Sequence, residues 1–199
     1  MTVKSPKSFN SQIGLPLSLF QIEKKHDLGI FEVGISKPDE MDNQENIFHP
    51  KIGLLTHIGS AHSANFSSEE ELINEKLKLF KNSEIIFYNA DNLLTVKIIN
   101  ELYSSKKLIS YGLEINNDIH IISDVNDRTK DIQIKYFDEI ITLPIFQRDE
   151  ATLTNVLALI GILKELKISN SDIKEKIDAL KAIEMRLESI EGIRNNLII

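Results

Sequence analysis

The amino-acid sequence predicts an α/β fold: a mostly parallel sheet flanked by helices, with a small antiparallel β-meander appended towards the carboxyl end. Two observations support this prediction. Apolar runs of strand length alternate with helix-like segments as far as residue 111, which favours right-handed βαβ units, and after residue 117 the runs lie too close together for intervening helices. The 199 residues are 42% hydrophobic and 27% charged, a balance typical of a globular domain.

The first expected helix covers residues 16–26, where Pro16 suits the first turn. A second helix, expected over 67–81, begins with Ser68 three residues before Glu71, which is the spacing of a capping box. Around them, apolar runs predict three buried strands, at residues 28–33, 51–58 and 83–89.

The second half of the chain begins with an expected helix over 91–104 and a strand over 107–111. Two more helices are expected over 150–166 and 171–182, the second opened by a Ser-Asn-Ser cluster. Between these pairs, short runs separated by Asn, Asp, Arg and Thr predict the three strands of the meander, at residues 118–125, 131–137 and 139–145.

Charge and composition exclude several classes of function. The net charge of −7 argues against a nucleic-acid or anionic-membrane surface. The chain has no cysteine, so a disulfide framework, thiolate zinc sites and cysteine nucleophiles are excluded, and any metal must be bound by oxygen or imidazole. No apolar run approaches the roughly 20 residues of a membrane helix and no signal peptide is evident, so we expect a soluble, cytoplasmic protein.

Lys76 lies in the middle of the apolar stripe of the helix expected over 67–81. The stripe is formed at helical spacing by Leu72, Ile73, Leu77 and Phe80. One interpretation is that the amine extends along this face to reach solvent. The other is that the amine is held inside a site, where its pKa falls and the neutral form reacts, for instance with carbon dioxide to give a metal-binding carbamate.

Glu32 and His62 belong to segments near the carboxyl ends of expected strands, where open α/β sheets bind their ligands. Glu32 lies in an apolar run, and a buried carboxylate needs a cation or hydrogen bonds. With a carbamate on Lys76, these residues would form a site suited to magnesium or manganese, although His62 alone is equally typical of a loop. The other histidines are expected to be surface or strand residues: His26, His49, His57 and His120.

Asn155 is the third unusual residue. It shares a face of the helix expected over 150–166 with Leu159, Ile162 and Leu166, and a buried amide there needs partners for its donors and its acceptor. The amide could cap a neighbouring loop or hydrogen-bond to a nucleobase.

Six short segments follow one another along nearly the whole chain: SPKSFNSQIGLPLSL (5–19), IFEVGISKPDEM (30–41), IGLLTHIGSAHSANF (52–66), NEKLKLF (74–80), YNADN (88–92) and MRLE (185–188). In this order they resemble the motifs of the Mur ligases, which form amide bonds in peptidoglycan precursors at the expense of ATP. The resemblance implies a middle domain of P-loop-NTPase-like fold over residues 1–184, and the start of the C-terminal ligase domain at 185–199.

The resemblance also implies roles for individual residues. Glu32 and His62 would help to hold magnesium, and Lys76 would carry the carbamate that positions a magnesium ion against the γ-phosphate of ATP. Asn155 would face the adenine, and Arg186 would approach the nucleotide phosphates. Near the reacting phosphate, the motif spacing leaves two candidates, Asn10 and Gln12.

Within the family, the first segment is most similar to ligases that add D-alanyl-D-alanine to UDP-N-acetylmuramoyl-tripeptide through an acyl phosphate, especially the form fused to alanine racemase. The phosphate-binding loop of the family would precede residue 1, and the C-terminal domain would continue beyond Ile199. We therefore expect a middle-domain fragment that by itself neither hydrolyses ATP nor ligates peptide.

Three departures from the family pattern leave alternatives open. His57 replaces the usual asparagine, Asp39 stands where glycine is common, and ATLTN at 151–155 keeps only the last asparagine of H-N-x-x-N. One alternative is a folylpolyglutamate synthase, which shares the fold and the carbamate chemistry but should show a different motif near the N-terminus. Another is a degenerate nucleotide-binding or scaffold module without catalysis.

Overall fold

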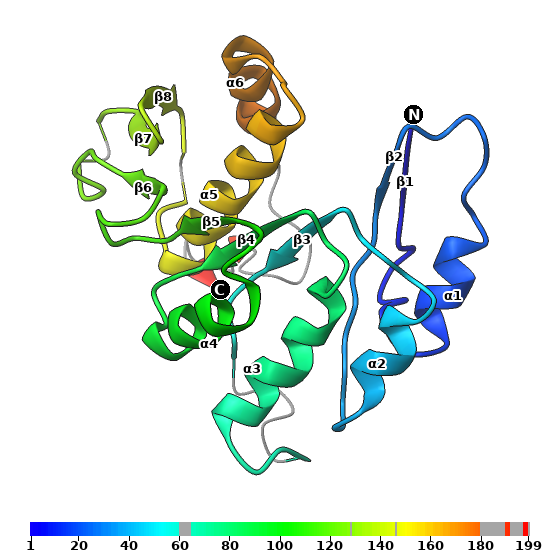
Figure 1. Ribbon diagram of the computed structural model, residues 1–199. Helices are drawn as coiled ribbons and strands as arrows, with labels where there is room; N and C mark the ends of the chain where they lie inside the picture. Colours follow the sequence, from blue (N-terminus) through cyan, green and yellow to red (C-terminus); the bar gives the residue numbers. More distant parts are fainter. Residues whose placement is uncertain (60–64, 128, 146, 180–189, 192–196, 199) are drawn as a thin grey trace.

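The computed structural model describes residues 1–59, 65–127, 129–145, 147–179, 190–191 and 197–198. Its main feature is a six-stranded sheet in which the strands follow their order in the chain (Figure 1). Neighbours from β3 to β6 are parallel, and β7 and β8 continue antiparallel, which confirms the predicted parallel sheet with an antiparallel meander. The strands are β3 (Ile52–Leu55), β4 (Ile85–Asn89), β5 (Lys107–Tyr111), β6 (Ile119–Ile121), β7 (Ile132–Tyr136) and β8 (Glu139–Leu143).

A separate two-stranded parallel sheet lies at the N-terminal side of the molecule, on the right of Figure 1. It pairs β1 (Thr2–Lys4), which the sequence pattern did not predict, with β2 (Leu28–Ile30), the first half of the strand expected over 28–33. The backbone N–H of Ser5 donates to the carbonyl of Ile30 and extends the pairing by one bond. This sheet holds the segment that carries Glu32.

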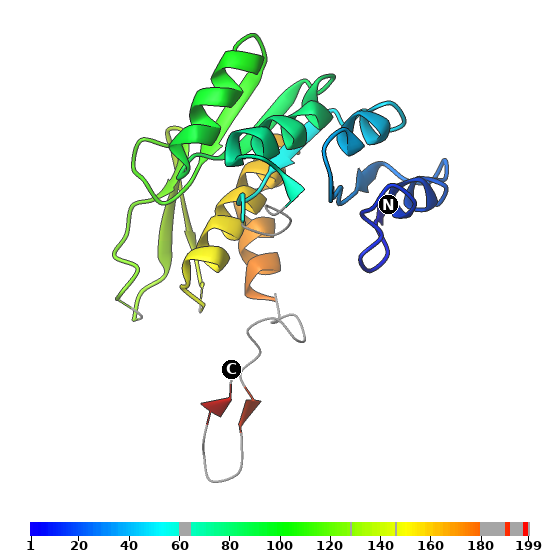
Figure 2. The same ribbon diagram turned by 90° about the horizontal axis from the view of Figure 1, so that it is seen from below.

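Helices cover both faces of the large sheet, as Figure 2 shows. Because side chains alternate along a strand, Ile86 and Tyr88 of β4 pack with α3 and α4, whereas Phe87 between them packs with α5 on the opposite face. The fold therefore has two apolar cores, one on each side of the sheet. The helices are α3 (Glu69–Leu77), continued by a 3-10 turn η2 (Lys78–Phe80), α4 (Leu93–Tyr103), α5 (Glu150–Glu165) and α6 (Asn170–Asp178).

Side-chain caps begin these four helices and explain why the sequence located them well. Ser68 Oγ accepts from the backbone N–H of Glu71 at 3.1 Å, as the capping-box spacing predicts. The carboxylate of Glu71, however, returns to the backbone N–H of Ser67, one residue further back than in a standard box. Equivalent caps are made by Asn92, Asp149 and Ser169.

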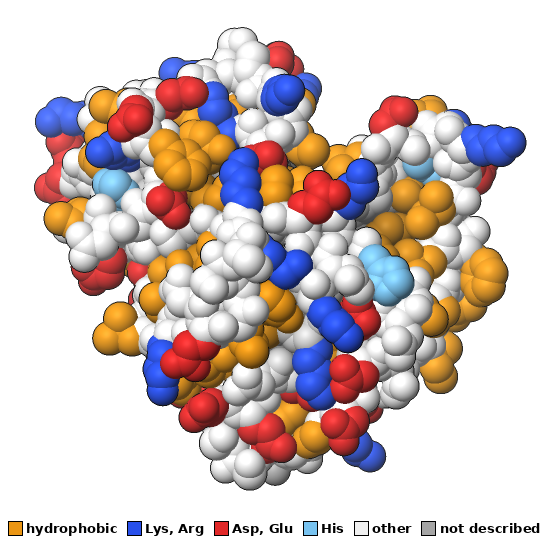
Figure 3. All heavy atoms as spheres, in the orientation of Figure 1, with side chains coloured by type: hydrophobic (Ala, Val, Ile, Leu, Met, Phe, Trp, Pro, Cys, Tyr) orange, Lys and Arg blue, Asp and Glu red, His pale blue; other side chains and the backbone are white. Residues whose placement is uncertain are grey.

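The helix expected over 16–26 is the clearest error in the predicted elements. The observed α1 covers Gly14–Leu19, so Pro16 is its third residue and the segment 20–26 forms turns. Phe20 is 86% exposed, and among the described residues neither apolar core includes it or the residues after it in this segment. Exposed apolar side chains accordingly lie over the N-terminal part of the molecule in Figure 3.

A short helix, α2 (Glu40–Glu45), was not predicted at all. Its sequence, EMDNQE, is almost wholly polar, yet Met41 and Gln44 are both buried. Two residues in six are too few for a helical period to be recognised, although Pro38 followed by acidic residues is typical of a helix start.

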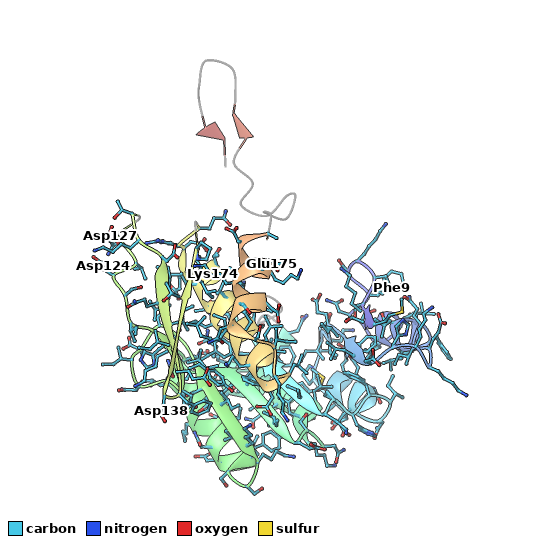
Figure 4. The ribbon with its side chains drawn as sticks, turned by 90° about the horizontal axis from the view of Figure 1, so that it is seen from above. Phe9, Asp124, Asp127, Asp138, Lys174 and Glu175 are labelled. Carbon is cyan, nitrogen blue, oxygen red and sulfur yellow. The ribbon has the colours of Figure 1, made fainter. Side chains whose placement is uncertain are left out.

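The meander ends in loops at opposite sides of the molecule. In Figure 4, Asp124 and Asp127 lie at one end and Asp138 at the other, while Phe9 lies in the separate N-terminal unit. In the tail, two-residue strands β9 (Ile190–Glu191) and β10 (Leu197–Ile198) pair antiparallel, and a domain boundary at residue 185 stays a prediction. Within the described ranges, no helix has the length and apolar character to cross a bilayer.

Candidate functional site

The structure brings together two of the predicted site residues, Asn10 and Glu32. Asn10 Nδ2 donates to Glu32 Oε1 at 2.7 Å, and the backbone N–H of Glu32 donates to Ser5 Oγ at 3.1 Å. These residues are 22 positions apart in the sequence, and the β1–β2 pairing places their segments side by side. Asn10 is therefore the candidate of the first motif that lies beside the carboxylate.

Glu32 is exposed, so the expectation of a buried carboxylate was wrong. The carboxylate lies two residues past the end of β2, in a sheet too small to cover it. Within the described residues, its Oε2 makes no hydrogen bond, whereas Oε1 is held by Asn10. An oriented carboxylate with one free oxygen fits the preference of Mg²⁺ for oxygen ligands.

Gly34 closes the contact between the two segments. Its backbone N–H donates to the carbonyl of Asn10 at 2.7 Å. A Cβ at this position would lie 3.3 Å from Asn10 Nδ2, tighter than most such contacts. The E-x-G pattern of residues 32–34 thus combines a carboxylate with the close backbone approach that holds its partner.

Gln12, the other candidate of the first motif, lies elsewhere. Its side chain lies near the carboxylate of Glu40, at the start of α2, and contributes to the lowered pKa of that group. That carboxylate accepts from the backbone N–H groups of Ser36 and Lys37, at 2.6 and 3.1 Å. The bond from Ser36 is the main cause of a lowered pKa of Glu40, so the carboxylate is charged at neutral pH and clamps this loop.

Lys76 is half-buried on α3, between the buried stripe residues that the sequence predicts. Burial lowers the pKa of its amine, which raises the neutral fraction that could react with carbon dioxide. Partial burial of this kind fits both interpretations, and the amine held in a site stays a prediction. The carboxylate of the preceding residue, Glu75, is turned to α2, where it accepts from the backbone N–H of Met41 at 2.9 Å.

His62 and Arg186 lie outside the described residues, so their meeting with Glu32 and Lys76 stays a prediction. Asn65 lies three residues after His62 in the sequence and is described. Its Nδ2 donates to the carbonyl of Ser36 at 2.9 Å, which places residue 65 beside the loop that follows Glu32. No group of three His, Asp or Glu residues suited to a metal occurs in the part of the chain that the structure describes.

Asn155 is exposed on α5, so the expectation of a buried amide there was wrong. Leu159, on the same face, is 36% exposed, because α5 packs on the sheet through other residues such as Leu153 and Leu157. Across the described ranges, the amide makes no hydrogen bond, which leaves its donors and acceptor open to a ligand.

The remaining histidines behave as predicted. His49 and His57 are exposed and His26 lies in a turn, where its Nδ1 accepts from the backbone N–H of Glu23. His120 is buried in β6, with its Nδ1 2.7 Å from the carbonyl oxygen of Asn117.

A cavity of about 370 Å³ lies elsewhere, in the meander, and includes none of the predicted site residues. Its polar lining consists of Ser123, Asp124, Asp127, Lys130, Asp131, Gln133 and Thr142. Hydrogen bonds from Thr129 and Lys130 lower the pKa of Asp127 to about 2. The shift therefore comes from residues next to Asp127 in the same loop and does not indicate a ligand.

The fold and these contacts define a class of protein. It is an α/β domain with a carboxylate held by an amide beside a short parallel strand pair, and with a half-buried lysine and an exposed amide on helices that flank the large sheet. The family model of the Mur ligase middle domain matches residues 1–163. The chain belongs to this family.

Sequence and structure comparisons agree with that assignment. The UDP-N-acetylmuramoyl-tripeptide–D-alanyl-D-alanine ligase of Bacillus subtilis is 26% identical over 193 residues, which cover 94% of this chain and 40% of the relative. The crystal structure of MurF ligase from Thermotoga maritima in complex with ADP has a TM-score of 0.80 at 21% identity, over 96% of this chain and 45% of that one. FPGS of L. casei follows with a TM-score of 0.62 at 14% identity, over 93% and 46% of the chains. The chain thus spans about 40% of the length of its Bacillus relative.

Proposed function

We propose that this chain is the ATP-binding middle part of a cytoplasmic ligase that adds D-alanyl-D-alanine to UDP-N-acetylmuramoyl-tripeptide during peptidoglycan precursor synthesis. The observation that carries the proposal is the hydrogen bond between Asn10 and Glu32, which joins two family motifs into one site. The names of the curated relatives supply the substrates, and the ADP complex of the Thermotoga neighbour supports a nucleotide.

In this proposal Glu32 and His62 hold magnesium, with Lys76 contributing as a carbamate. When bound, magnesium neutralises charge on the phosphate oxygens and orients them. The neutral amine of Lys76 attacks carbon dioxide, forms an N–C bond and releases one proton, leaving a carboxylate-like group. Burial of the amine favours this step because it lowers the lysine pKa.

The remaining roles concern the nucleotide and the substrates. The exposed amide of Asn155 has the donor and acceptor pair that matches the edge of adenine, and Arg186 approaches the phosphates. The tripeptide carboxylate attacks the γ-phosphorus, ADP leaves, and the amine of D-alanyl-D-alanine then displaces phosphate from the acyl phosphate. Asn10 keeps the Glu32 carboxylate oriented near the reacting phosphate, while Gln12 lies near Glu40, whose carboxylate holds the adjoining loop.

The alternatives receive less support. A folylpolyglutamate synthase would be expected to match FPGS better than the D-alanyl-D-alanine ligases, whereas the TM-scores are 0.62 and 0.80. A scaffold module without catalysis would not need the Asn10–Glu32 pair. We also propose that the parent protein is fused to an alanine racemase, and the only support for this is the similarity of residues 5–19 to the fused form of the ligase.

The experiment uses the natural protein that carries this chain, at its full length. We expect ADP release that requires both UDP-N-acetylmuramoyl-tripeptide and D-alanyl-D-alanine, and we expect the 199-residue chain alone to show none. Glu32→Gln and Lys76→Met should abolish turnover, whereas the matched exposed replacements Glu23→Gln and Lys81→Met should not. Product formation without ATP, or full turnover by Lys76→Met, would contradict the proposal.

A further inference from the structure

Gln44 is a buried polar residue that neither the sequence motifs nor the proposed mechanism uses. Its side chain belongs to α2 and is 1% exposed. Nε2 donates to the carbonyl of Gly34 at 2.7 Å, while Oε1 is buried and has no hydrogen-bond partner among the described residues.

Three hydrogen bonds lead from this amide to the candidate metal ligand. Gln44 binds the carbonyl of Gly34, the N–H of Gly34 binds the carbonyl of Asn10, and the Asn10 side chain binds Glu32 Oε1, each at 2.7 Å. Glycine has the widest choice of backbone dihedrals, so a glycine held at both its N–H and its C=O loses that freedom. Gln44 therefore helps to fix Gly34, whose rotation would disturb the contact between the Asn10 and Glu32 segments.

Helix α2 is itself held at two places. Glu40 binds the loop of Ser36 and Lys37 on one side. On the other side, Glu75 of α3 accepts from the N–H of Met41, and Lys78 of η2, which continues α3, pairs with Asp42 at 2.7 Å. The helix thus connects the Glu32 segment to the helix that carries Lys76.

Stability alone gives little reason for an amide at position 44. Its buried oxygen has no partner among the described residues, and this cost offsets the hydrogen bond that its Nε2 donates, whereas a methionine of similar length would fill the space without either. The donor also sets the direction of the Gly34 carbonyl.

We infer that Gln44 is a positioning residue that sets the orientation of the Glu32 carboxylate through Gly34 and Asn10. The inference rests on the proposed function, because it assigns Glu32 to magnesium. Partners of metal ligands of this kind typically change metal affinity or activity by about 10- to 100-fold when they are replaced.

The test compares Gln44→Met with the wild type in two settings. In the full-length protein, we expect the magnesium concentration for half-maximal turnover to rise by about 10-fold or more, while the KM for D-alanyl-D-alanine and the unfolding midpoint change little. In the 199-residue chain, we expect amide hydrogen exchange at Gly34 to accelerate about 10-fold and the side-chain NH₂ resonances of Asn10 to shift in nuclear magnetic resonance spectra.

Thr95→Val is the matched control, since Thr95 Oγ1 is also buried without a described partner but lies in α4, away from this segment. It should change neither readout. If Gln44→Met fails to fold, Gly34→Ala serves as the second variant. Its Cβ would lie 3.3 Å from Asn10 Nδ2 and displace that amide, so it should also raise the magnesium concentration for half-maximal turnover.

Unchanged exchange at Gly34 in Gln44→Met would overturn the inference, as would faster exchange combined with an unchanged magnesium requirement. If the full-length wild type has no ligase activity, the proposed function fails, while the exchange measurement still decides whether Gln44 holds Gly34 and Asn10.

Discussion

Replacing Glu75 by leucine should destabilise the fold through a single lost contact between two helices. The Glu75 side chain is 5% exposed and accepts from the backbone N–H of Met41 at 2.9 Å. It also pairs with Lys78 at 2.8 Å. Leucine fills a similar volume but accepts nothing, so the buried N–H of Met41 loses its partner.

The expected cost follows from what each partner retains. Leaving a buried backbone N–H unpaired costs about 1–3 kcal/mol. Lys78 adds little to this, because its side chain is 35% exposed and keeps Asp42 at 2.7 Å. The loss should therefore be about 2 kcal/mol, which corresponds to roughly 4–8 °C in the melting temperature of a chain of this size. Glu75→Gln should cost less, since its Oε1 still accepts from Met41.

The pH dependence gives a second signature. Hydrogen bonds to Asp42 and then to Glu75 raise the pKa of Lys78 above its ordinary value. A raised lysine pKa contributes stability that is complete below the unfolded pKa of about 10.4 and is lost as pH rises through the folded pKa. The difference in the free energy of unfolding between wild type and Glu75→Leu should stay constant from pH 7 to about pH 9. It should become smaller above about pH 10.5, as Lys78 loses its proton.

Urea unfolding followed by far-ultraviolet circular dichroism measures this loss. Glu70→Leu is the control, because Glu70 lies on the same helix with an exposed side chain. A change below about 0.5 kcal/mol for Glu75→Leu, the range of ordinary surface substitutions, would refute the reasoning, as would an equal loss in Glu70→Leu.

Three further predictions concern backbone strain, packing and lysine chemistry. Asp39 has a φ of 64°, so Asp39→Val should lower the free energy of unfolding by about 1–2 kcal/mol in urea titrations, whereas Asp39→Gly should be tolerated. A Cβ on Gly53 would lie 2.5 Å from the ring of Phe80, so Gly53→Ala should lower the melting temperature at a cost of about 1–3 kcal/mol, and Phe80→Leu in the same chain should recover part of it. Because burial lowers the pKa of Lys76, the native state binds fewer protons than the unfolded one between the folded pKa and the unfolded pKa of about 10.4, and the free energy of unfolding rises with pH across that range. In competitive acylation followed by mass spectrometry, labelling of Lys76 should therefore reach its half-maximal rate at a lower pH than labelling of exposed Lys81; equal midpoints would contradict the lowered pKa.

The structure also explains one departure from the family pattern. Asp39 stands where glycine is common, and its left-handed backbone is the conformation that glycine adopts without strain. Aspartate is one of the few other residues that visit this region, so the position can keep the turn into α2 without glycine.

Local patterns nominated the residues of the candidate site but not their contacts. The first motif left Asn10 and Gln12 equivalent, because motif spacing gives the order of residues and not their partners. The structure separates them: Asn10 donates to Glu32, whereas Gln12 lies near Glu40 and contributes to its lowered pKa. That choice depends on α2, whose short polar sequence has no readable period.

The sequence by itself determined the elements whose signals lie within a few residues: capped helices such as α3 and α5, the alternation that orders the parallel strands, and the family motifs. Only the tertiary structure decided that Glu32 and Asn155 are exposed, that β1 and β2 form a sheet of their own, and that α2 joins two site segments. The reason is physical. Caps and periodicity depend on neighbours along the chain, whereas the exposure of a side chain and its partner depend on which distant segments pack beside it.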